Sequence, residues 1–263
     1  MKQNPSPPLF AEERREQIIK LLAEQSKLLV PNLCDIFDVS PATIRSDLRD
    51  LESEGRLKRT HGGAIPIGKA GFEPDSHSKE VEKIDEKIKI AVYSAGLIED
   101  GDIVALDTGT TTLELAKRLT DKKNLTIVTN DVNISMYLEA NSNANIILLG
   151  GTVRRGFHCT TGIMTINSLK DLNVDKAFMA TNAFSLEKGF TTPSFEHAEV
   201  KKAMLSIASQ NIMLMDSSKF GRVSFVKFAS LGCVDRIVTD KGVGSKTVES
   251  ILEGNENIEL ISV

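Results

Sequence analysis

Apolar residues in the first part of the chain recur at the spacing of amphipathic helices. Between residues 11 and 24, Ile18, Ile19 and Leu22 stand among charged side chains, which predicts a first helix with one apolar face. Residues 31–37 predict a second, shorter helix that ends in a tight turn. The chain therefore begins with a pair of short helices.

A third helix is predicted to begin at Ser40. Its hydroxyl can accept hydrogen bonds from the free amides of a first helical turn, and Pro41 suits the next position, where no amide hydrogen is needed. Ile44, Leu48 and Leu51 then share one buried face. The opposite face is small, polar and cationic, with Ala42, Arg45, Ser46 and Arg49. The second and third helices, joined by a tight turn, predict a helix-turn-helix.

The segment after this helix is basic. Gly55 is a plausible stop for the helix, and residues 56–69 contain four Lys or Arg, one His and no acid. The pattern suits a small β-wing. Its positive field would favour contact with phosphate groups.

Beyond residue 100, short apolar runs alternate with amphipathic segments. This alternation predicts an α/β fold, in which a mostly parallel sheet carries helices on both faces. The predicted helices lie near residues 111–119, 131–140 and 196–209. The predicted strands are residues 103–106, 125–129, 145–149, 177–180, 212–215, 236–239 and 258–262.

A linker and a long helix are predicted between these two patterns. Residues 65–78 are rich in Gly, Pro and Ser and have no apolar periodicity, which is typical of a linker. Helical spacing then holds over residues 79–97 and predicts one continuous helix. We therefore divide the chain into a helix-turn-helix domain at 1–64, a linker at 65–78 and an α/β domain at 79–263.

Composition indicates a globular protein of two domains. The chain has 263 residues, 41% apolar and 26% charged, and a net charge of −4. Residues 1–64 contain ten Lys or Arg and ten Asp or Glu, so the excess of acid lies in the larger domain, which by charge is not a nucleic-acid binder. The sequence has no signal peptide and no apolar run long enough for a membrane span. We expect a cytoplasmic protein with no membrane partner.

Cysteine and glycine patterns indicate neither a metal nor a cofactor. Three isolated cysteines favour neither a disulfide framework nor a zinc site. His158 and Cys159 are neighbours, but no third ligand lies at useful spacing. A Gly-x-x-x-x-Gly-Lys-Ser/Thr loop is absent, which disfavours a nucleotide-regulated factor.

The exposed face of the third helix has the chemistry of a DNA reader. Small residues early in such a helix allow close approach to base edges, and its arginines can reach phosphate groups or guanine. The residues expected to contact double-stranded DNA are Ser40, Ala42, Thr43, Arg45, Ser46 and Arg49, with Arg59 and His61 in the wing. One reader offers too little contact for operator-grade affinity, so we expect a dimer or a higher homo-oligomer. The alternative is a winged helix for protein contacts, with solvated arginines.

Polar residues follow several of the predicted strands. Because the carboxyl ends of parallel strands meet at one edge of a sheet, these residues would share a pocket. Threonine hydroxyls and amides at a helix start suit a phosphate, with Lys219 as the opposing charge. The residues expected to bind the ligand are Asp107, Gly109, Thr110, Thr111, Thr112, Asn130, Gly151, Glu196 and Lys219. The alternative is a helix cap whose threonines satisfy backbone amides. Arg154 and Arg155 are ambiguous between solvated loop and phosphate contact, and Lys201 favours a structural role.

Motifs along residues 11–245 resemble the DeoR family of bacterial transcription regulators. In the first domain they are Arg15, Ile18, residues 39–40, 43–45 and 47–48, Leu51, Gly55, Arg59 and residues 61–64. In the second they are residues 107–112, 128–130 and 150–151, Gly189, Thr191, Glu196, Lys201 and residues 216–221. One departure is Ser46, where the family usually has a second arginine.

This resemblance implies a winged helix-turn-helix followed by a Rossmann-like sensor domain similar to ribose-5-phosphate isomerase. It implies a repressor of carbohydrate-metabolism genes whose operator affinity is controlled by a phosphorylated sugar. The alternative is a sugar-phosphate isomerase that carries a regulatory winged helix. Asp107 and Glu196 could supply carboxylates, but the sequence lacks a further acid motif like the one those isomerases carry.

Overall fold

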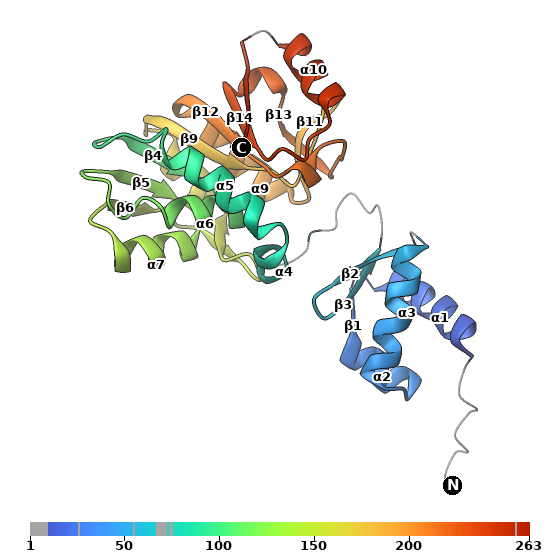
Figure 1. Cartoon of the computed structure of the whole chain (residues 1–263). Helices are drawn as coiled ribbons and strands as arrows, with labels where there is room; N and C mark the ends of the chain where they lie inside the picture. Colours follow the sequence, from blue (N-terminus) through green and yellow to red (C-terminus); the bar gives the residue numbers. More distant parts are fainter. Residues whose placement is uncertain (1–9, 26, 55, 67–72, 74–75, 256) are drawn as a thin grey trace. The chain divides into compact units, whose positions relative to one another are not determined.

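The computed structural model describes residues 10–25, 27–54, 56–66, 73, 76–255 and 257–263 (Figure 1). The chain divides into two units, Met1–Pro74 and Asp75–Val263. The division falls inside the segment predicted as a linker, of which residues 67–72 and 74–75 lie outside the described residues. Gly55, the predicted helix stop, also lies outside them.

The first unit is a winged helix-turn-helix, as predicted. Its helices are α1 (Ala11–Glu24), α2 (Val30–Phe37) and α3 (Pro41–Ser53). Its antiparallel strands, in the sheet order β1-β3-β2, are β1 (Leu28–Leu29), β2 (Leu57–Thr60) and β3 (Gly63–Pro66). Asp38 makes the tight turn between α2 and α3 in the left-handed conformation, with φ 51°. The apolar faces of the three helices form one core.

The second unit is built on a seven-stranded parallel sheet. Every neighbouring pair in the order β15-β14-β12-β9-β4-β5-β6 runs parallel. The strands are β4 (Ile103–Leu106), β5 (Thr126–Thr129), β6 (Asn145–Leu148), β9 (Val174–Ala180), β12 (Ala208–Leu214), β14 (Arg236–Thr239) and β15 (Glu259–Ser262). All seven predicted strands are present. β9 and β12 begin earlier than predicted because their less apolar first residues pair with each other, Val174 opposite Ala208.

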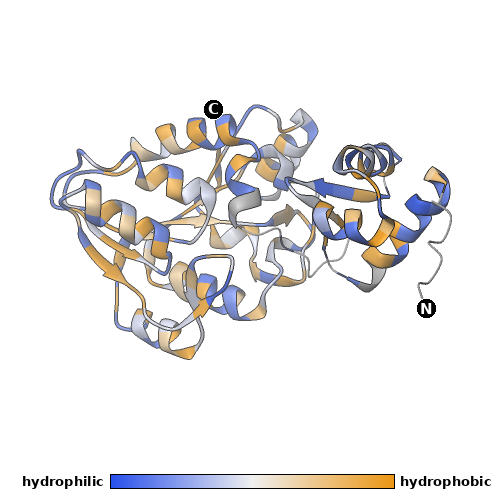
Figure 2. Ribbon diagram, turned by 90° about the horizontal axis from the view of Figure 1, so that it is seen from below, coloured by the Kyte–Doolittle hydropathy of each residue, from blue (hydrophilic) through white to orange (hydrophobic). Residues whose placement is uncertain are grey.

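Helices cover both faces of this sheet. One core lies beneath α5 (Ile84–Ala95), α6 (Thr110–Ala116) and α7 (Val132–Asn141), which run beside one another in Figure 1. The other lies beneath α8 (Ile163–Leu169), α9 (Phe195–Ser206) and α10 (Ser245–Gly254). Figure 2 shows apolar strands and helices that carry both apolar and polar residues, as this layering requires. Among the described residues, no helix has the length and apolar character to cross a membrane.

The continuous helix predicted over residues 79–97 is wrong. α4 (Ser76–Val81) and α5 are separate, because Lys83 adopts a left-handed conformation with φ 57° between them. The buried Lys87 ammonium donates to the carbonyl oxygens of Lys79 and Glu82, the latter at 2.5 Å. These bonds satisfy carbonyls that the break leaves without helical partners. Apolar periodicity continues across the break, so it does not reveal the break.

The sequence did not predict two smaller sheets. A hairpin pairs β7 (Thr152–Arg154) with β8 (Cys159–Thr161). A three-stranded antiparallel sheet contains β10 (Ala183–Ser185), β11 (Gly189–Thr192) and β13 (Val226–Ala229). The short 3-10 helix η1 (Ser217–Lys219) follows β12. These segments bring polar residues to the carboxyl edge of the main sheet.

Candidate functional site

α3 presents the face that the sequence predicted. The Ser40 hydroxyl caps the helix by accepting from the Thr43 amide at 3.2 Å, and the two hydroxyl groups lie 2.9 Å apart. The exposed residues of this face are Ser40, Ala42, Arg45, Ser46 and Arg49. His61 is exposed at the turn between β2 and β3. The first unit therefore offers a helix face and a wing tip to a partner.

The arginines of the first unit fall into two classes. Arg14, Arg15, Arg56 and Arg59 each lie within 4.0 Å of a carboxylate, and the Arg59 guanidinium is 3.8 Å from Glu52. Arg45 and Arg49 form no ion pair within the described part of the chain. These two cations remain available to an external anion, as a phosphate-binding helix requires.

A buried ion pair beneath α3 was not predicted. Arg14 donates to both carboxylate oxygens of Asp47, at 2.6 and 3.1 Å, and Arg15 Nε lies 3.4 Å from the same carboxylate. Asp47 is 2% exposed. The available signal was its position: Asp47 falls beside Leu48 on the apolar face of α3. The pair fixes the helix that carries Arg45 and Arg49 against α1.

In the second unit, the loops after β4 and β9 meet at the point where the strand order reverses. β4 and β9 are neighbours, but the chain proceeds from β4 toward β5 and from β9 toward β12. Crevices at such switch points are the usual ligand sites of open parallel sheets. Asp107 Oδ2 accepts from the Ala180 amide at 3.0 Å and from the Lys201 ammonium, which also donates to the Ala180 carbonyl at 2.8 Å. This ion pair ties the two loops together.

The Asp107 carboxylate is fully buried and remains ionised. Burial alone would raise its pKa, but Lys201 and the nearby His197 hold the pKa of Asp107 below its usual range. His197 Nε2 lies 3.7 Å from Asp107 Oδ1. Lys201, for which the sequence favoured a structural role, is 1% exposed. Asp107 thus forms the floor of the site together with residues of α9.

The β4 and β5 loops are joined by a second buried contact. Thr108 Oγ1 donates to Asp131 Oδ2 at 2.5 Å, and Asn130 Nδ2 donates to the Thr160 carbonyl at 2.9 Å. Burial raises the pKa of Asp131. Asn130 Oδ1 is buried and accepts no hydrogen bond from the described residues. Asn130 therefore lies in the loop that is hydrogen-bonded to the Asp107 loop, and its side-chain oxygen has no donor among the described residues.

The predicted threonines differ in exposure. Thr110 is partly exposed, whereas Thr111 is 7% exposed and Thr112 is fully buried, its hydroxyl donating to the Gly109 carbonyl at 2.9 Å. Gly109 lies so close to β9 that a Cβ there would stand 3.0 Å from the Ala180 Cβ. Gly109 and Thr110 therefore have the better access to a ligand.

Gly151 is required by local packing. Its φ is 147°, and an added Cβ would stand 2.7 Å from the Thr161 carbonyl oxygen. The Thr160 hydroxyl donates to the Leu149 carbonyl at 2.7 Å and so links this loop to Asn130. Contact of Gly151 with a ligand stays a prediction.

Glu196 and Lys219 lie apart from this hydrogen-bonded set within the described residues. Glu196 is exposed at the start of α9, where backbone and Ser194 hydrogen bonds lower its pKa, with a contribution from Arg154. Lys219 Nζ lies 3.6 Å from Asp216 and lowers the pKa of that buried carboxyl. The Arg154 guanidinium stacks 3.7 Å from the Phe157 ring centre. Glu196, Lys219 and Arg154 are therefore each oriented by a separate neighbour, namely Ser194, Asp216 and Phe157.

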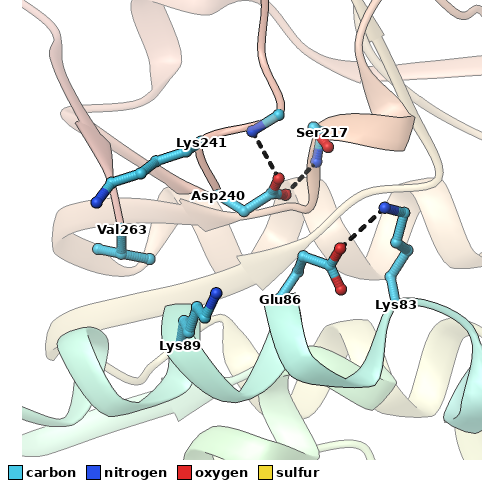
Figure 3. A pocket seen from close by; sticks show the side chains of 8 residues that line it. Lys83, Glu86, Lys89, Ser217, Asp240, Lys241 and Val263 are labelled. Carbon is cyan, nitrogen blue, oxygen red and sulfur yellow. Dashed lines mark hydrogen bonds and ion pairs between the residues drawn. The ribbon is translucent and has the colours of Figure 1, made fainter.

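A charged cavity of about 330 Å³ lies beside α5 (Figure 3). Its lining residues are Lys83, Glu86, Lys89, Ser217, Asp240, Lys241, Gly242 and Val263. Lys83 donates to Glu86 at 2.9 Å, while Asp240 accepts from the amides of Ser217 and Gly242 at 2.6 and 2.8 Å. The cavity was not predicted. It places the start of α5 against the loop that contains Asp216 and Lys219.

Comparison with known proteins gives the same assignment for both units. A model described as "DeoR C terminal sensor domain" matches residues 82–241, and one described as "DeoR-like helix-turn-helix domain" matches residues 14–69. The HTH-type transcriptional regulator GlpR of Haloferax volcanii is 36% identical over 91% of this chain and 93% of its own. The transcriptional repressor AccR of Agrobacterium fabrum is 34% identical over 92% and 94%.

Among solved structures, ribose 5-phosphate isomerase A of Methanocaldococcus jannaschii matches 53% of this chain and 55% of that chain, with 18% identity and a TM-score of 0.39. This likeness is too low to bear on function. The family models and the relatives, by contrast, extend over nearly the whole chain. The chain belongs to the DeoR family of helix-turn-helix transcriptional regulators.

Proposed function

We propose that this regulator is a cytoplasmic repressor of carbohydrate-metabolism genes whose affinity for double-stranded operator DNA is controlled by a phosphorylated sugar. The observation that carries the proposal is the set of polar loops after β4, β5 and β9, held together at the switch point of the sheet by Asp107 and Asp131. Such a site can distinguish a ligand by its contacts, and a ligand that prefers one state of the protein shifts its DNA affinity.

Both parts of a phosphorylated sugar have partners in this site. The unused Asn130 Oδ1 suits a sugar hydroxyl, because a buried acceptor without a donor carries a free-energy cost that a ligand can remove. The backbone and hydroxyl of Thr110 suit a phosphate, and Lys219, which lies outside the hydrogen-bonded set and beside Asp216, would supply a positive charge. Asp107 acts by positioning the β4 loop. Direct contacts of the remaining predicted residues with the ligand stay part of the proposal.

The isomerase alternative is disfavoured by the state of Asp107. A general base works best when its pKa lies near the working pH, but Lys201 and His197 hold the pKa of Asp107 below its usual range. Its Oδ2 is also occupied by two donors. We expect no turnover of sugar phosphates. Steady conversion that Asp107→Asn abolishes would contradict this conclusion.

A homo-oligomer is part of the proposal. α3 is a short helix, and a two-fold pair of such helices would read two half-sites of a palindromic operator. Sedimentation of the full chain with and without an operator duplex measures the number of copies. A monomer that binds its operator with full affinity would exclude this arrangement.

A thermal-shift screen against a panel of phosphorylated sugars tests the ligand. A ligand at 100 times its Kd stabilises the folded state by about 2.7 kcal/mol, which raises the melting temperature. The pair of substitutions Thr110→Ala and Thr111→Ala should reduce this shift and spare DNA affinity. Lys219→Glu should do the same, whereas Thr120→Ala, just beyond α6, is the matched control. If the variants released DNA at the same ligand concentration as the parent protein, the effector would bind elsewhere.

A further inference from the structure

α4 contacts two elements that lie next to the loops of the candidate effector site. The Ser76 amide donates to the Gly156 carbonyl at 3.0 Å, and the Lys79 ammonium lies 5.5 Å from the Phe157 ring centre. Both contacts are to the loop between β7 and β8. α4 also lies beside α6, whose first residue is Thr110. α4 is thus the first element after the linker segment and a neighbour of the polar loops.

Arg154 extends this connection toward the pocket. Its guanidinium stacks on Phe157, the same ring that faces Lys79. Its positive charge also lowers the pKa of Cys159 and Glu196, although burial raises the pKa of Cys159 overall. The β7–β8 loop therefore contacts α4 and places the charge of Arg154 close enough to Cys159 and Glu196 to influence both.

Lys87 holds the opposite end of α4. It is 3% exposed, and its ammonium donates to the carbonyl oxygens of Lys79 and Glu82 at the C-terminal end of the helix. A buried ammonium needs such acceptors because transfer from water is costly without them. Lys87 therefore contributes to the position of α4 relative to α5.

The Lys87 ammonium interacts electrostatically with the loop that contains Lys219. Residues of the first turns of α5 line a cavity with Ser217, next to Asp216. Burial and, to a smaller extent, Lys219 together lower the pKa of Lys87 to about 8, while Asp216 acts in the opposite direction. The Lys87 ammonium, held by the carbonyl groups of α4, is thus repelled by Lys219 and attracted by Asp216. An anion beside Lys219 would offset this repulsion and add to the attraction exerted by Asp216.

We propose that Lys87 is a positioning residue that couples the effector site to α4: an anion held beside Lys219 draws the Lys87 ammonium away from the carbonyl oxygens of Lys79 and Glu82 and loosens α4. This inference rests on the proposed effector site. It adds a route by which ligand binding at the effector site would change α4, the helix that follows the linker segment. Ligand binding alone, without a change in α4, would not carry the signal along this route.

Hydrogen exchange of the full chain tests the route with inorganic phosphate as the probe and chloride at equal ionic strength as the reference. Peptides that cover residues 107–116 report binding, and peptides that cover 76–83 report α4. Phosphate should slow exchange in the first set and accelerate it in the second by at least about fivefold, the factor that corresponds to roughly 1 kcal/mol. In Lys87→Met the first response should persist and the second should vanish. Lys89→Met, an exposed position on the same helix, is the matched control and should keep both responses.

The outcomes separate this inference from the proposed function. No response at residues 107–116 in the parent protein would remove the phosphate site and the inference with it. Protection there with unchanged α4 would overturn only the inference. An α4 response that survives Lys87→Met would also overturn it. Loss of both responses in Lys87→Met would show that Lys87 binds the anion itself, which contradicts a positioning role.

Discussion

Each unit of the molecule contains a buried ion pair, and the two pairs stand in different relations to function. Arg14 and Asp47 lie beneath α3, while the cations expected to meet DNA, Arg45 and Arg49, lie outside and unpaired within the described residues. In the second unit the pair of Asp107 and Lys201 lies within the candidate site itself, between the loops after β4 and β9. The first unit separates the groups that stabilise from the groups that bind.

The ligands proposed for the two units would require this difference. A DNA surface is large and anionic, so a rigid helix with exposed cations suffices. A small polar ligand must be enclosed by groups that are already oriented, and buried polar groups need partners of their own in the absence of the ligand. We therefore expect stability and binding to respond independently to substitutions in the first unit and together in the second.

The largest effect is expected from breaking the pair in the first unit. Asp47→Ala leaves the Arg14 guanidinium buried without its carboxylate, which should destabilise this unit by about 3–5 kcal/mol. Calorimetry of the full chain would show one transition shifted to lower temperature and the other unchanged. Arg56→Met, which removes an exposed pair with Glu16, is the control and should leave both transitions in place. Equal behaviour of the two variants would mean that the buried pair contributes little.

A smaller loss is expected in the second unit. Lys201→Met leaves Asp107 with the Ala180 amide and His197, so the cost should be about 2–4 kcal/mol. The double change of Asp107→Asn with Lys201→Met removes both charges and should recover part of this stability. The thermal-shift response to ligand should fall in every one of these variants. If one of these variants lost stability but kept the ligand response of the parent protein, stability and binding would be independent in the second unit too, and the expected difference between the units would be wrong.

The exposed arginines should affect DNA binding alone. Arg45→Ala with Arg49→Ala should weaken affinity by about 1–3 kcal/mol and reduce the slope of log affinity against log salt by about two. Fluorescence anisotropy at several salt concentrations measures both quantities. The pair Lys170→Ala with Lys246→Ala removes the same charge from exposed positions of the second unit and is the control. Reduced stability in the Arg45 and Arg49 variant would show that these side chains also hold the fold.

Elements with strong apolar periodicity were predictable from the sequence. The buried face of α3 follows from its helical periodicity, and the seven parallel strands follow from short continuous apolar runs, because helices cover both faces of the sheet. The break between α4 and α5 was not predictable in this way. It depends on the left-handed Lys83 and on a buried lysine, neither of which changes the apolar pattern.

The candidate site was predictable only in part. Its loops follow from the positions of strand ends, and Asp107 was identified for that reason. Its pairing partner lies 94 residues away on α9, and the Thr108–Asp131 contact joins two separate loops. Such long-range polar contacts depend on the strand order, which local patterns do not specify. The hairpin that contains Arg154 was missed because its strands are three residues each.

The smallest effect is expected at Lys87, where one substitution should change both the stability of the second unit and the proposed response of α4 to ligand. The pKa of Lys87 is about 8 in the folded chain, against an ordinary value of 10.5, because its ammonium is buried and repelled by Lys219. Lys79 lowers this pKa further in the same direction, whereas Asp216 and Glu82 raise it, and the value of about 8 includes all of these effects. Below pH 8 the ammonium is present in both folded and unfolded states and the folded state bears the cost of burying it. Between pH 8 and 10.5 the unfolded chain binds more protons, so stability should rise with pH relative to Lys87→Met.

From pH 8 to pH 9 the rise should amount to about 1 kcal/mol, since one unit of pKa corresponds to about 1.4 kcal/mol and the folded-state lysine is half titrated at pH 8. Urea unfolding of the parent protein and of Lys87→Met across this range measures the difference, which cancels the other titrating groups that both proteins share. A difference independent of pH would mean that the ammonium is fully compensated by the carbonyl oxygens of Lys79 and Glu82. The Lys87 ammonium would then have no tendency to leave α4. Lys87 would resemble Arg14, a buried cation that only stabilises its unit.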